Sequence, residues 1–369
     1  MATTMPALAT TMVIPRSRRL ASVTVTLLAL ILAACGESPN AATPTAPATA
    51  ERPSPPAPAT LTVGAFSAAA EVFRAKILPQ FSDQWRRTHG QQVRFVEQYQ
   101  GSGLLAQAIA TDYAADIAVF SHAEDVAHLV HLGLVADTWR SAPHHGIVSR
   151  SLVVLAVRKD NPRSIRDWSD LVQPGLQIVT PDPGTSGGGM WNVCAIYGAA
   201  LRGHAGVPAN DPAAALAFVA RVLANVIDSK DSASAAFQCF QDGTGDVAIT
   251  YESEVAKGWM FGHDEQRVIP RSTLLVENPA VVVIRNADRH GVRAVAEGLL
   301  RYLWSTEAQK RMAFCGLRPI DPAVAADTAR QFPVPEDLWT IEDLGGWDCA
   351  VRDILVPAGF GGQAAGPGK

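Results

Sequence analysis

The sequence of 369 residues predicts an α/β fold with a mostly parallel sheet that helices cover on both faces. Two observations predict it. Short apolar runs alternate with longer runs of helical periodicity from residue 61 to about residue 305, which is typical of βαβ units. Several of the helical runs stop at a glycine, such as Gly90 and Gly133, as helices that end in a left-handed residue do.

The expected strands are seven short apolar runs, at residues 61–65, 93–97, 117–120, 152–157, 176–179, 247–251 and 280–284. The expected helices are runs of helical periodicity, at residues 69–87, 104–112, 125–132, 192–201, 212–223 and 293–305. In such sheets, ligands bind beyond the carboxyl ends of the strands, where the helices begin. The segments that follow the strands are therefore the places to search for a site.

The segment from Thr180 to Asn192 is the most informative of these. It follows an apolar strand, passes two prolines and places Ser186 and three glycines, residues 187–189, at the start of a helical run. Free N–H groups of a first helical turn and the helix macrodipole favour an anion there. Glycine allows close approach of the backbone, and a serine N-cap adds a hydroxyl. The segment predicts a cradle for a small oxyanion.

Serine recurs at the same place in other strand-to-helix junctions. Ser67, Ser102 and the Ser232–Ser234 turn each stand at or beside the start of a helical run, as Ser186 does. One serine N-cap is ordinary helix chemistry. Four of them after strand ends favour convergence on one anion.

Two other interpretations of the cradle remain open. Residues 184–188, Gly-Thr-Ser-Gly-Gly, match the G-x-S-x-G pattern of a serine hydrolase whose nucleophile would be Ser186. Such an enzyme needs a base later in the chain, and the later histidines, His204, His263 and His290, stand in no recognisable acid–histidine context. The other interpretation is a plain glycine-rich turn.

The N-terminal region indicates export. Arginines at 16, 18 and 19 precede an apolar run, residues 20–32, which is too short to span a membrane and suits a signal peptide, residues 1–34. The run ends in Leu-Ala-Ala-Cys, which resembles the bacterial lipoprotein box and makes Cys35 the lipidated residue. Residues 36–60 are rich in Pro, Ala and Thr, so residues 35–60 form the expected lipid anchor and extended tether. We therefore expect a periplasmic or cell-surface lipoprotein that touches the membrane only through its anchor.

Charge and composition exclude several classes of partner. The formal net charge is −4 and no basic run is present, so nucleic acid is not an expected partner. The group His122, Glu124, Asp125, His128 and His131 is interpreted as a solvated helix face rather than a metal site, and no cofactor motif is visible. The even number of cysteines after Cys35 permits two disulfides in an exported chain, with three possible connectivities.

Ordered motifs along the chain resemble a known family. They are Gly101-Ser102-Gly103, residues 158–162 with 165–171, residues 180–192, residues 245–247 running into 251–254, residues 317–322 and Gly345-Gly346-Trp347. Together they are similar to the sulfate-binding proteins of bacterial ABC importers, which are type II periplasmic binding proteins related to molybdate binders. The resemblance covers nearly all of residues 61–349.

The resemblance implies a two-lobed clamp that is not an enzyme and holds a dianion with N–H groups and hydroxyls. Residues 61–148 and 285–356 would form lobe one, residues 149–284 lobe two, and residues 357–369 a tail. The implied substrate-binding residues are Ser67, Ser102, Gly103, Ser186, Gly187, Gly188, Ser232, Ser234 and Tyr251. The implied partners are the permease subunits of an importer, with the receptor a monomer. Under this lobe division the disulfides would be Cys194–Cys239 and Cys315–Cys349, because a bridge between lobes would hinder closure.

The identity of the anion stays open at this point. Sulfate or thiosulfate suits a site that offers only donors, whereas phosphate keeps a proton that needs an acceptor, for which Asp231 is available although an exposed turn is favoured for it. Molybdate and tungstate share sulfate's charge. The residue at position 251 is Tyr where the sulfate binders carry an indole donor, and the loop at Ser67 is more similar to that of molybdate binders. A surface sensor built on the same clamp is a further alternative.

Overall fold

The structure, a computed structural model, describes residues 56–360, so the signal peptide, Cys35, most of the tether and most of the tail lie outside the described residues. Ten strands form one sheet whose main path is β2-β1-β3-β9-β4-β7-β5-β6. All seven expected strands are present. The strands are β1 (Ala59–Phe66), β2 (Val93–Gln100), β3 (Ile117–Val119), β4 (Ile147–Val157), β5 (Ile178–Pro181), β6 (Val226–Lys230), β7 (Val247–Tyr251), β8 (Gln266–Val268), β9 (Ser272–Val282) and β10 (Asp337–Trp339).

The sheet consists of two parallel groups joined by two long strands. In the first group, β1 pairs in parallel with β2 and β3, and in the second, β5 pairs in parallel with β6 and β7. The 11-residue strands β4 and β9 pair antiparallel with each other, β9 with β3 and β4 with β7. We call the β2-β1-β3 group the first half-sheet and the β7-β5-β6 group the second half-sheet. The expected parallel pairing therefore holds within each group and gives way to antiparallel pairing where β4 and β9 connect them.

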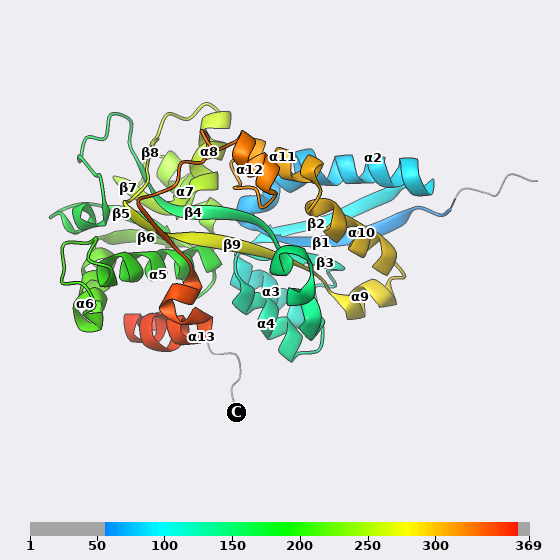
Figure 1. The fold of residues 1–369 in the computed structure, drawn as a ribbon, viewed down its shortest axis with the longest axis horizontal. Helices are drawn as coiled ribbons and strands as arrows, with labels where there is room; N and C mark the ends of the chain where they lie inside the picture. The colour runs from blue at the N-terminus through cyan, green and yellow to red at the C-terminus, as the bar shows by residue number, and fades with distance from the viewer. Residues whose placement is uncertain (1–55, 361–369) are drawn as a thin grey trace, which may run out of the picture. The chain divides into compact units, whose positions relative to one another are not determined.

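Helices cover both faces of the sheet, as predicted. In the view of Figure 1, α3, α4, α5, α6 and α13 lie below the sheet, and α2, α7, α8, α11 and α12 lie above it. The longer helices are α2 (Leu78–His89), α3 (Ser102–Thr111), α4 (Ala123–His131), α5 (Gly187–Leu201), α6 (Pro212–Leu223), α7 (Ala233–Gln241), α8 (Glu252–Met260), α10 (Arg293–Leu303) and α11 (Thr306–Phe314). The shorter ones are α1 (Ala70–Val72), α9 (Ile284–Arg289), α12 (Pro322–Asp327) and α13 (Gly346–Ala350).

The remaining helical turns are irregular. They are η1 (Ser67–Ala69), η2 (Phe73–Ile77), η3 (Asp137–Ser141), η4 (Pro143–Gly146), η5 (Trp168–Val172), η6 (Ile341–Leu344) and η7 (Val351–Phe360). The expected helix at residues 69–87 is one continuous run made of η1, α1, η2 and α2, in which η2 is a π-helical turn. Within residues 56–360, no helix has both the length and the apolar character that crossing a membrane requires.

The C-terminal segment after residue 336 packs beside β9, α5 and α6. In the structure, β10 pairs in parallel with Ser272–Leu274 at the start of β9, and η7 packs against α5 and α6, which belong to the second half-sheet. The physical reason is apolar burial, because Trp339, Ile354 and Leu355 become buried there.

Candidate functional site

Three strand-to-helix junctions meet beyond the ends of the sheet strands. Gly101 precedes α3 at the end of β2, and a Cβ placed on it would lie 2.2 Å from the carbonyl oxygen of Asp231 and 2.5 Å from that of Thr185. Asp231 precedes α7 and Thr185 precedes α5, so the first half-sheet touches two junctions of the second. The Leu104 N–H also donates to the Thr185 carbonyl oxygen at 3.3 Å. The N-termini of α3, α5 and α7 therefore converge, which concentrates N–H groups and positive dipole ends at one place.

Gly187, the first residue of α5, lies against a loop that the sequence analysis did not include in the site. A Cβ on Gly187 would lie 1.8 Å from Ser121 Oγ and 2.8 Å from His122 Nε2. Both residues follow β3 and are buried. Ser121 could have been found from the sequence by the rule that selected the other serines, because it stands directly after the expected strand at 117–120. We call these junctions, together with Ser121, His122 and Tyr251, the candidate anion site.

The interpretation of His122 and Asp125 as part of a solvated helix face is wrong. Both are buried, and the His122 Nδ1 caps α4 by accepting from the Asp125 N–H at 3.4 Å. Burial lowers the pKa of the His122 imidazole, and the neighbouring Asp125 carboxylate opposes this. In the part of the chain that the structure describes, no three His, Cys, Asp or Glu side chains gather as metal ligands would.

The hydroxyl of Ser102 is engaged within the protein. It donates to the Asp125 Oδ2 and accepts from the Ser121 N–H at 2.9 Å. The proton of this hydroxyl is therefore directed at a carboxylate. Ser102 can still offer its backbone N–H, because the first N–H groups of a helix have no partner within the helix. Its neighbour Gly103 begins the same turn and lies against Thr185.

Ser67 and Ser234 meet on the other side of the site. The Ser234 N–H donates to Ser67 Oγ at 3.3 Å, and the Ser234 hydroxyl donates to the buried Glu254 Oε1 at 2.6 Å. Lys257 Nζ lies 2.5 Å from Glu254 Oε2 and 3.3 Å from Ser234 Oγ. The Lys257 ammonium group is thus paired with the Glu254 carboxylate, and the Ser234 hydroxyl lies between it and the start of α7.

Ser186 and Ser232 are N-caps, as expected from their positions. Ser186 Oγ accepts from the Gly188 N–H at 3.2 Å and Ser232 Oγ accepts from the Ala235 N–H at 3.3 Å. Gly188 lies against α7, since a Cβ on it would be 3.2 Å from Ala233 Cβ. Trp191 packs behind the loop, as the sequence analysis favoured, and its indole N–H donates to the Ser121 carbonyl oxygen at 2.9 Å. All nine residues predicted from the sequence therefore lie at or beside these converging junctions.

Tyr251 ends β7 and is buried, with its ring edge-on to Phe66 at 6.4 Å between centroids. Burial raises the pKa of its phenol, while the adjacent Ser121 hydroxyl lowers it, so the phenol is neutral near neutral pH. A neutral phenol can donate one hydrogen bond and accept another. The phenol of Tyr251 can therefore serve as the hydrogen-bond donor that an indole N–H provides at this position in the sulfate binders.

Buried polar atoms without a hydrogen-bond partner gather at this place. They include Thr185 Oγ1 and the neighbouring hydroxyl oxygens of Ser121 and Tyr251, whereas His122 Nε2 lies 3.4 Å from Asp125 Oδ2. A buried polar group without a partner costs about 1–3 kcal/mol, so native structures leave few of them. Three at one convergence of helix N-termini are consistent with a small polar ligand as their partner.

The predicted disulfides do not form in the structure. Cys194, Cys239, Cys315 and Cys349 are all free. Cys194 is fully buried inside α5, where burial raises the pKa of its thiol to about 12, and Cys239 donates instead to Asp228 Oδ2 at 3.3 Å. The pairing rested on the lobe division, which says only which cysteines share a lobe.

The Asp231 side chain is exposed, as the sequence analysis favoured.

The fold and this convergence define the class of protein. Residues 61–318 match the family described as bacterial extracellular solute-binding protein, and this chain belongs to that family. Its resemblance to the sulfate-binding proteins of ABC importers is confirmed by the following relatives.

The sulfate-binding protein of Synechocystis is 32% identical over 324 residues, which span 87% of this chain and 90% of that protein. The sulfate-binding protein of Escherichia coli is 33% identical over 76% of this chain and 85% of its own length. The thiosulfate-binding protein of Pseudomonas aeruginosa is 30% identical over 78% of this chain and 87% of its own length. Among solved structures, the sulfate-binding protein SubI from Mycobacterium tuberculosis matches with a TM-score of 0.74 and 34% identity, covering 80% of this chain and 99% of that one.

Proposed function

We propose that this chain is an extracytoplasmic receptor that captures sulfate, or a similar tetrahedral oxyanion such as thiosulfate, and delivers it to an ABC importer. The observation that carries the proposal is the convergence of the α3, α5 and α7 N-termini beside the unpartnered polar atoms of Ser121, Thr185 and Tyr251. The relatives named for sulfate and thiosulfate binding support the choice of anion, and they do not favour molybdate, tungstate or phosphate, nor a hydrolase.

The donors and acceptors of the site support a fully deprotonated anion. The two buried carboxylates nearby, Asp125 and Glu254, already accept from the hydroxyls of Ser102 and Ser234. A protonated anion such as hydrogen phosphate would bring a proton that finds no free carboxylate, only the hydroxyl oxygens of the site, and a poorly matched buried donor costs about 1–3 kcal/mol. Sulfate carries no proton near neutral pH and needs only donors. The residues that we place around the anion are Ser67, Ser102, Gly103, Ser186, Gly187, Gly188, Ser232, Ser234 and Tyr251, with Ser121 added, although the N–H and hydroxyl of Ser234 already donate to Ser67 and Glu254.

The two half-sheets, with their helices, are the two lobes that we assign to the clamp. The boundary at residue 148 falls within the start of β4, and the boundary at residue 284 falls two residues after the end of β9; these are the long strands that connect the groups. The hydrogen bonds from Leu104 to Thr185 and from Ser234 to Ser67 join the two sides, which suits a closed clamp. We assign residues 337–360 to the second lobe because of their packing on α5 and α6.

Calorimetric titration of the purified protein tests the proposed function. Sulfate or thiosulfate should bind one anion per chain, and phosphate at least about tenfold more weakly, because one unmatched proton corresponds to a penalty of about 1.4 kcal/mol or more. Light scattering on the same sample should give the mass of one chain. Preference for phosphate, or no binding of any of these anions, would reject the proposal.

Tyr251→Phe connects the binding to this site. If the phenol donates to the anion, the substitution should weaken the preferred anion by about tenfold to a hundredfold, which is the value of a hydrogen bond to a charged group, about 1.5–3 kcal/mol. Tyr302→Phe is the matched control, since its hydroxyl is also buried and unpartnered but belongs to α10. An affinity of Tyr251→Phe within twofold of the unmodified protein would show that the phenol only packs.

We also infer that the mature protein is a lipoprotein anchored through Cys35, which lies outside the described residues. The support is the Leu-Ala-Ala-Cys sequence at the end of the apolar run and the Pro/Ala-rich segment that follows. Cys35→Ser should abolish incorporation of labelled palmitate and move the protein from the membrane fraction to the soluble fraction. Continued lipid labelling of this variant would contradict the assignment.

A further inference from the structure

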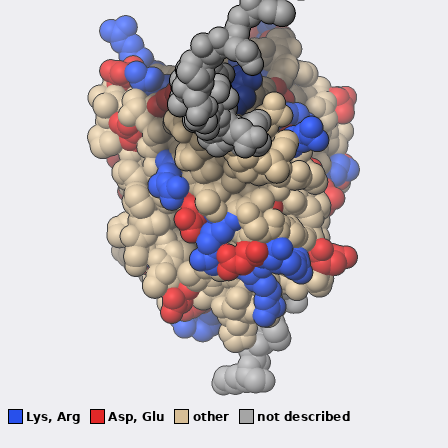
Figure 2. Space-filling view, turned by 90° about the vertical axis from the view of Figure 1, so that its right-hand side faces the viewer, with Lys and Arg blue, Asp and Glu red and all other residues tan. Residues whose placement is uncertain are grey.

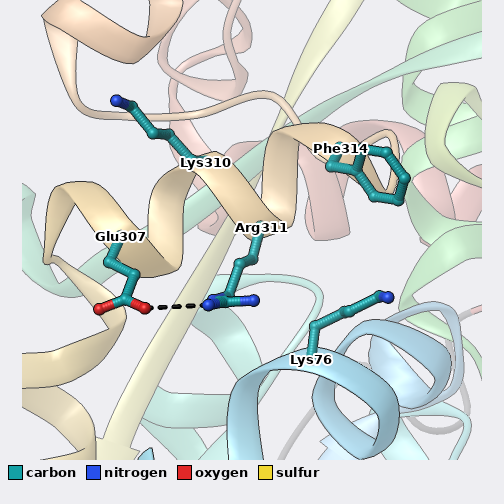
Figure 3. A pocket seen from close by; sticks show the side chains of 5 residues that line it. All are labelled: Lys76, Glu307, Lys310, Arg311 and Phe314. Atoms are coloured by element: carbon teal, nitrogen blue, oxygen red, sulfur yellow. Dashed lines mark hydrogen bonds and ion pairs between the residues drawn. The ribbon is translucent and has the colours of Figure 1, made fainter. Parts of the chain in front are cut away.

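A cavity lies on α11, outside the candidate anion site. Its volume is about 310 Å³, and Lys76, Glu307, Lys310, Arg311 and Phe314 line it. We call it the α11 pocket. In Figure 3, Arg311 projects from α11 and is joined to Glu307, Lys76 extends from the facing helix below Phe314, and Lys310 points away from these residues. Three cations and one carboxylate leave the pocket with an excess of two positive charges.

The positive charge of this pocket is only partly compensated. Glu307 pairs with Arg311 at 2.9 Å, whereas Lys76 and Lys310 have no ion pair among residues 56–360. The whole chain carries −4, and on the face shown in Figure 2 positive and negative side chains are interspersed. The α11 pocket is thus a local positive site on a mildly acidic protein, and charge complementarity favours an acidic occupant.

The exposed ring of Phe314 indicates that the occupant of the α11 pocket also has an apolar group. Its side chain is 65% exposed, and Lys76 Nζ lies 5.7 Å from the centre of its ring. An inorganic anion would use the cations and leave this ring in water. A protein segment with an acidic side chain next to an apolar one would use both, and charged pairs around an exposed aromatic anchor are typical of protein interfaces.

Two elements lead from the α11 pocket to residues of the candidate anion site, one to Ser67 and the other to Tyr251. Lys76 lies in the π-helical turn η2, on the helical run that begins at Ser67, about 14 Å along that run. Such π-helical turns are rare and occur frequently at functional sites. Two residues after Phe314, Gly316 lies against α8, since a Cβ on it would be 2.4 Å from Ala256 Cβ. Tyr251 is the residue that precedes α8.

We propose that the α11 pocket is the docking site for an acidic segment of the importer's permease. That the partner is the permease rests on the proposed function, whereas its acidic and apolar chemistry is inferred from the residues that line the pocket. A partner bound here contacts η2, which leads from Ser67, and the end of α11, which packs on the helix that follows Tyr251. The partner can therefore bind more tightly when η2, the end of α11 and α8 are packed together than when they are separated.

The test uses the full-length receptor and its own permease–ATPase complex in liposomes. The variant Lys76→Glu with Phe314→Ala should raise the receptor concentration needed for half-maximal ATPase stimulation by at least about tenfold. Sulfate affinity by calorimetry should be unchanged. Arg87→Glu with Val334→Ala is the matched control, because it reverses another exposed charge and truncates an apolar side chain that is 75% exposed. The control should behave as the unmodified receptor.

The other outcomes overturn either the inference or the proposed function. An unchanged stimulation curve for the pocket variant would place docking elsewhere, and a parallel loss of sulfate affinity would show that the pocket acts through the anion site. Flotation with liposomes that lack the importer tests a lipid surface, and equal binding to these would assign the pocket to anionic headgroups. If the unmodified receptor binds no sulfate, the proposed function fails. Docking is then still measured by flotation with liposomes that contain the importer. If the pocket variant binds these liposomes as well as the unmodified receptor does, the inference is overturned.

Discussion

Gly101→Ala is expected to weaken anion binding by at least about a hundredfold, or about 2.7 kcal/mol, without lowering the stability of the ligand-free protein. The φ angle of Gly101 is −55°, which alanine adopts readily, so the substitution does not strain the loop itself. The added methyl group would instead meet two backbone oxygens, those of Asp231 and Thr185, at 2.2 and 2.5 Å. Backbone atoms cannot rotate away as a side-chain tip can. The closed arrangement is therefore the state that the methyl group destabilises.

Gly103→Ala is the matched control for this prediction. Its Cβ would lie 3.3 Å from the Thr185 oxygen, a tight contact that a shift of a few tenths of an ångström relieves. We expect a loss of less than about tenfold. Calorimetry gives the affinities, and thermal unfolding without ligand gives the stabilities. If Gly101→Ala binds sulfate within threefold of the unmodified protein, then binding does not need this close approach.

The parallel core of the fold follows directly from the sequence, but the long connecting strands do not. The expected strand at 280–284 is only the end of β9, which begins at Ser272. Polar residues interrupt the apolar pattern of β9, and their partners come from β4: Glu277 pairs with Arg150 at 2.9 Å and Asn278 with Ser149 at 3.1 Å. Periodicity alone cannot reveal these cross-strand pairs, because the partners are more than 120 residues away in the chain.

The candidate site was predictable where local helix chemistry marks it. Ser67, Ser102, Ser186 and Ser232 stand at helix starts, and the structure brings these junctions together. The sequence does not reveal which hydroxyls are engaged by other side chains. Ser102 donates to Asp125, for which the sequence predicts a solvated helix face, and this pairing depends on how α4 packs against α3. The direction of a side chain is a tertiary property, so residue types at a junction identify the site but not its donors.

The position after Tyr251 carries a buried charge that was not assigned a role from the sequence. The Glu252 side chain is fully buried, and its carboxylate accepts from Arg318 Nε at 2.6 Å and from Arg267 Nη1 at 2.7 Å. Arg318 also exchanges backbone hydrogen bonds with Arg150 in β4 and donates to the Pro333 carbonyl oxygen at 2.8 Å. This ion pair therefore joins α8, β4 and the returning segment of the chain. A buried carboxylate without its cation is costly, because it loses water and gains nothing in return.

Arg318→Met is accordingly expected to lower the free energy of unfolding by about 3–5 kcal/mol, the usual effect of removing one partner from a buried pair, with Arg267 keeping the loss near the lower end. Denaturant titration followed by tryptophan fluorescence measures it. Arg271→Met is the control: this arginine pairs with Asp167 at 2.8 Å, but its side chain is 64% exposed, so about 0.2–1 kcal/mol should be lost. Replacing Glu252 and Arg318 together by methionine should recover only part of the loss, because no uncompensated carboxylate remains but Arg267 loses its partner. Equal losses for Arg318→Met and Arg271→Met would mean that water reaches Glu252 in solution and that burial of this pair does not stabilise the fold.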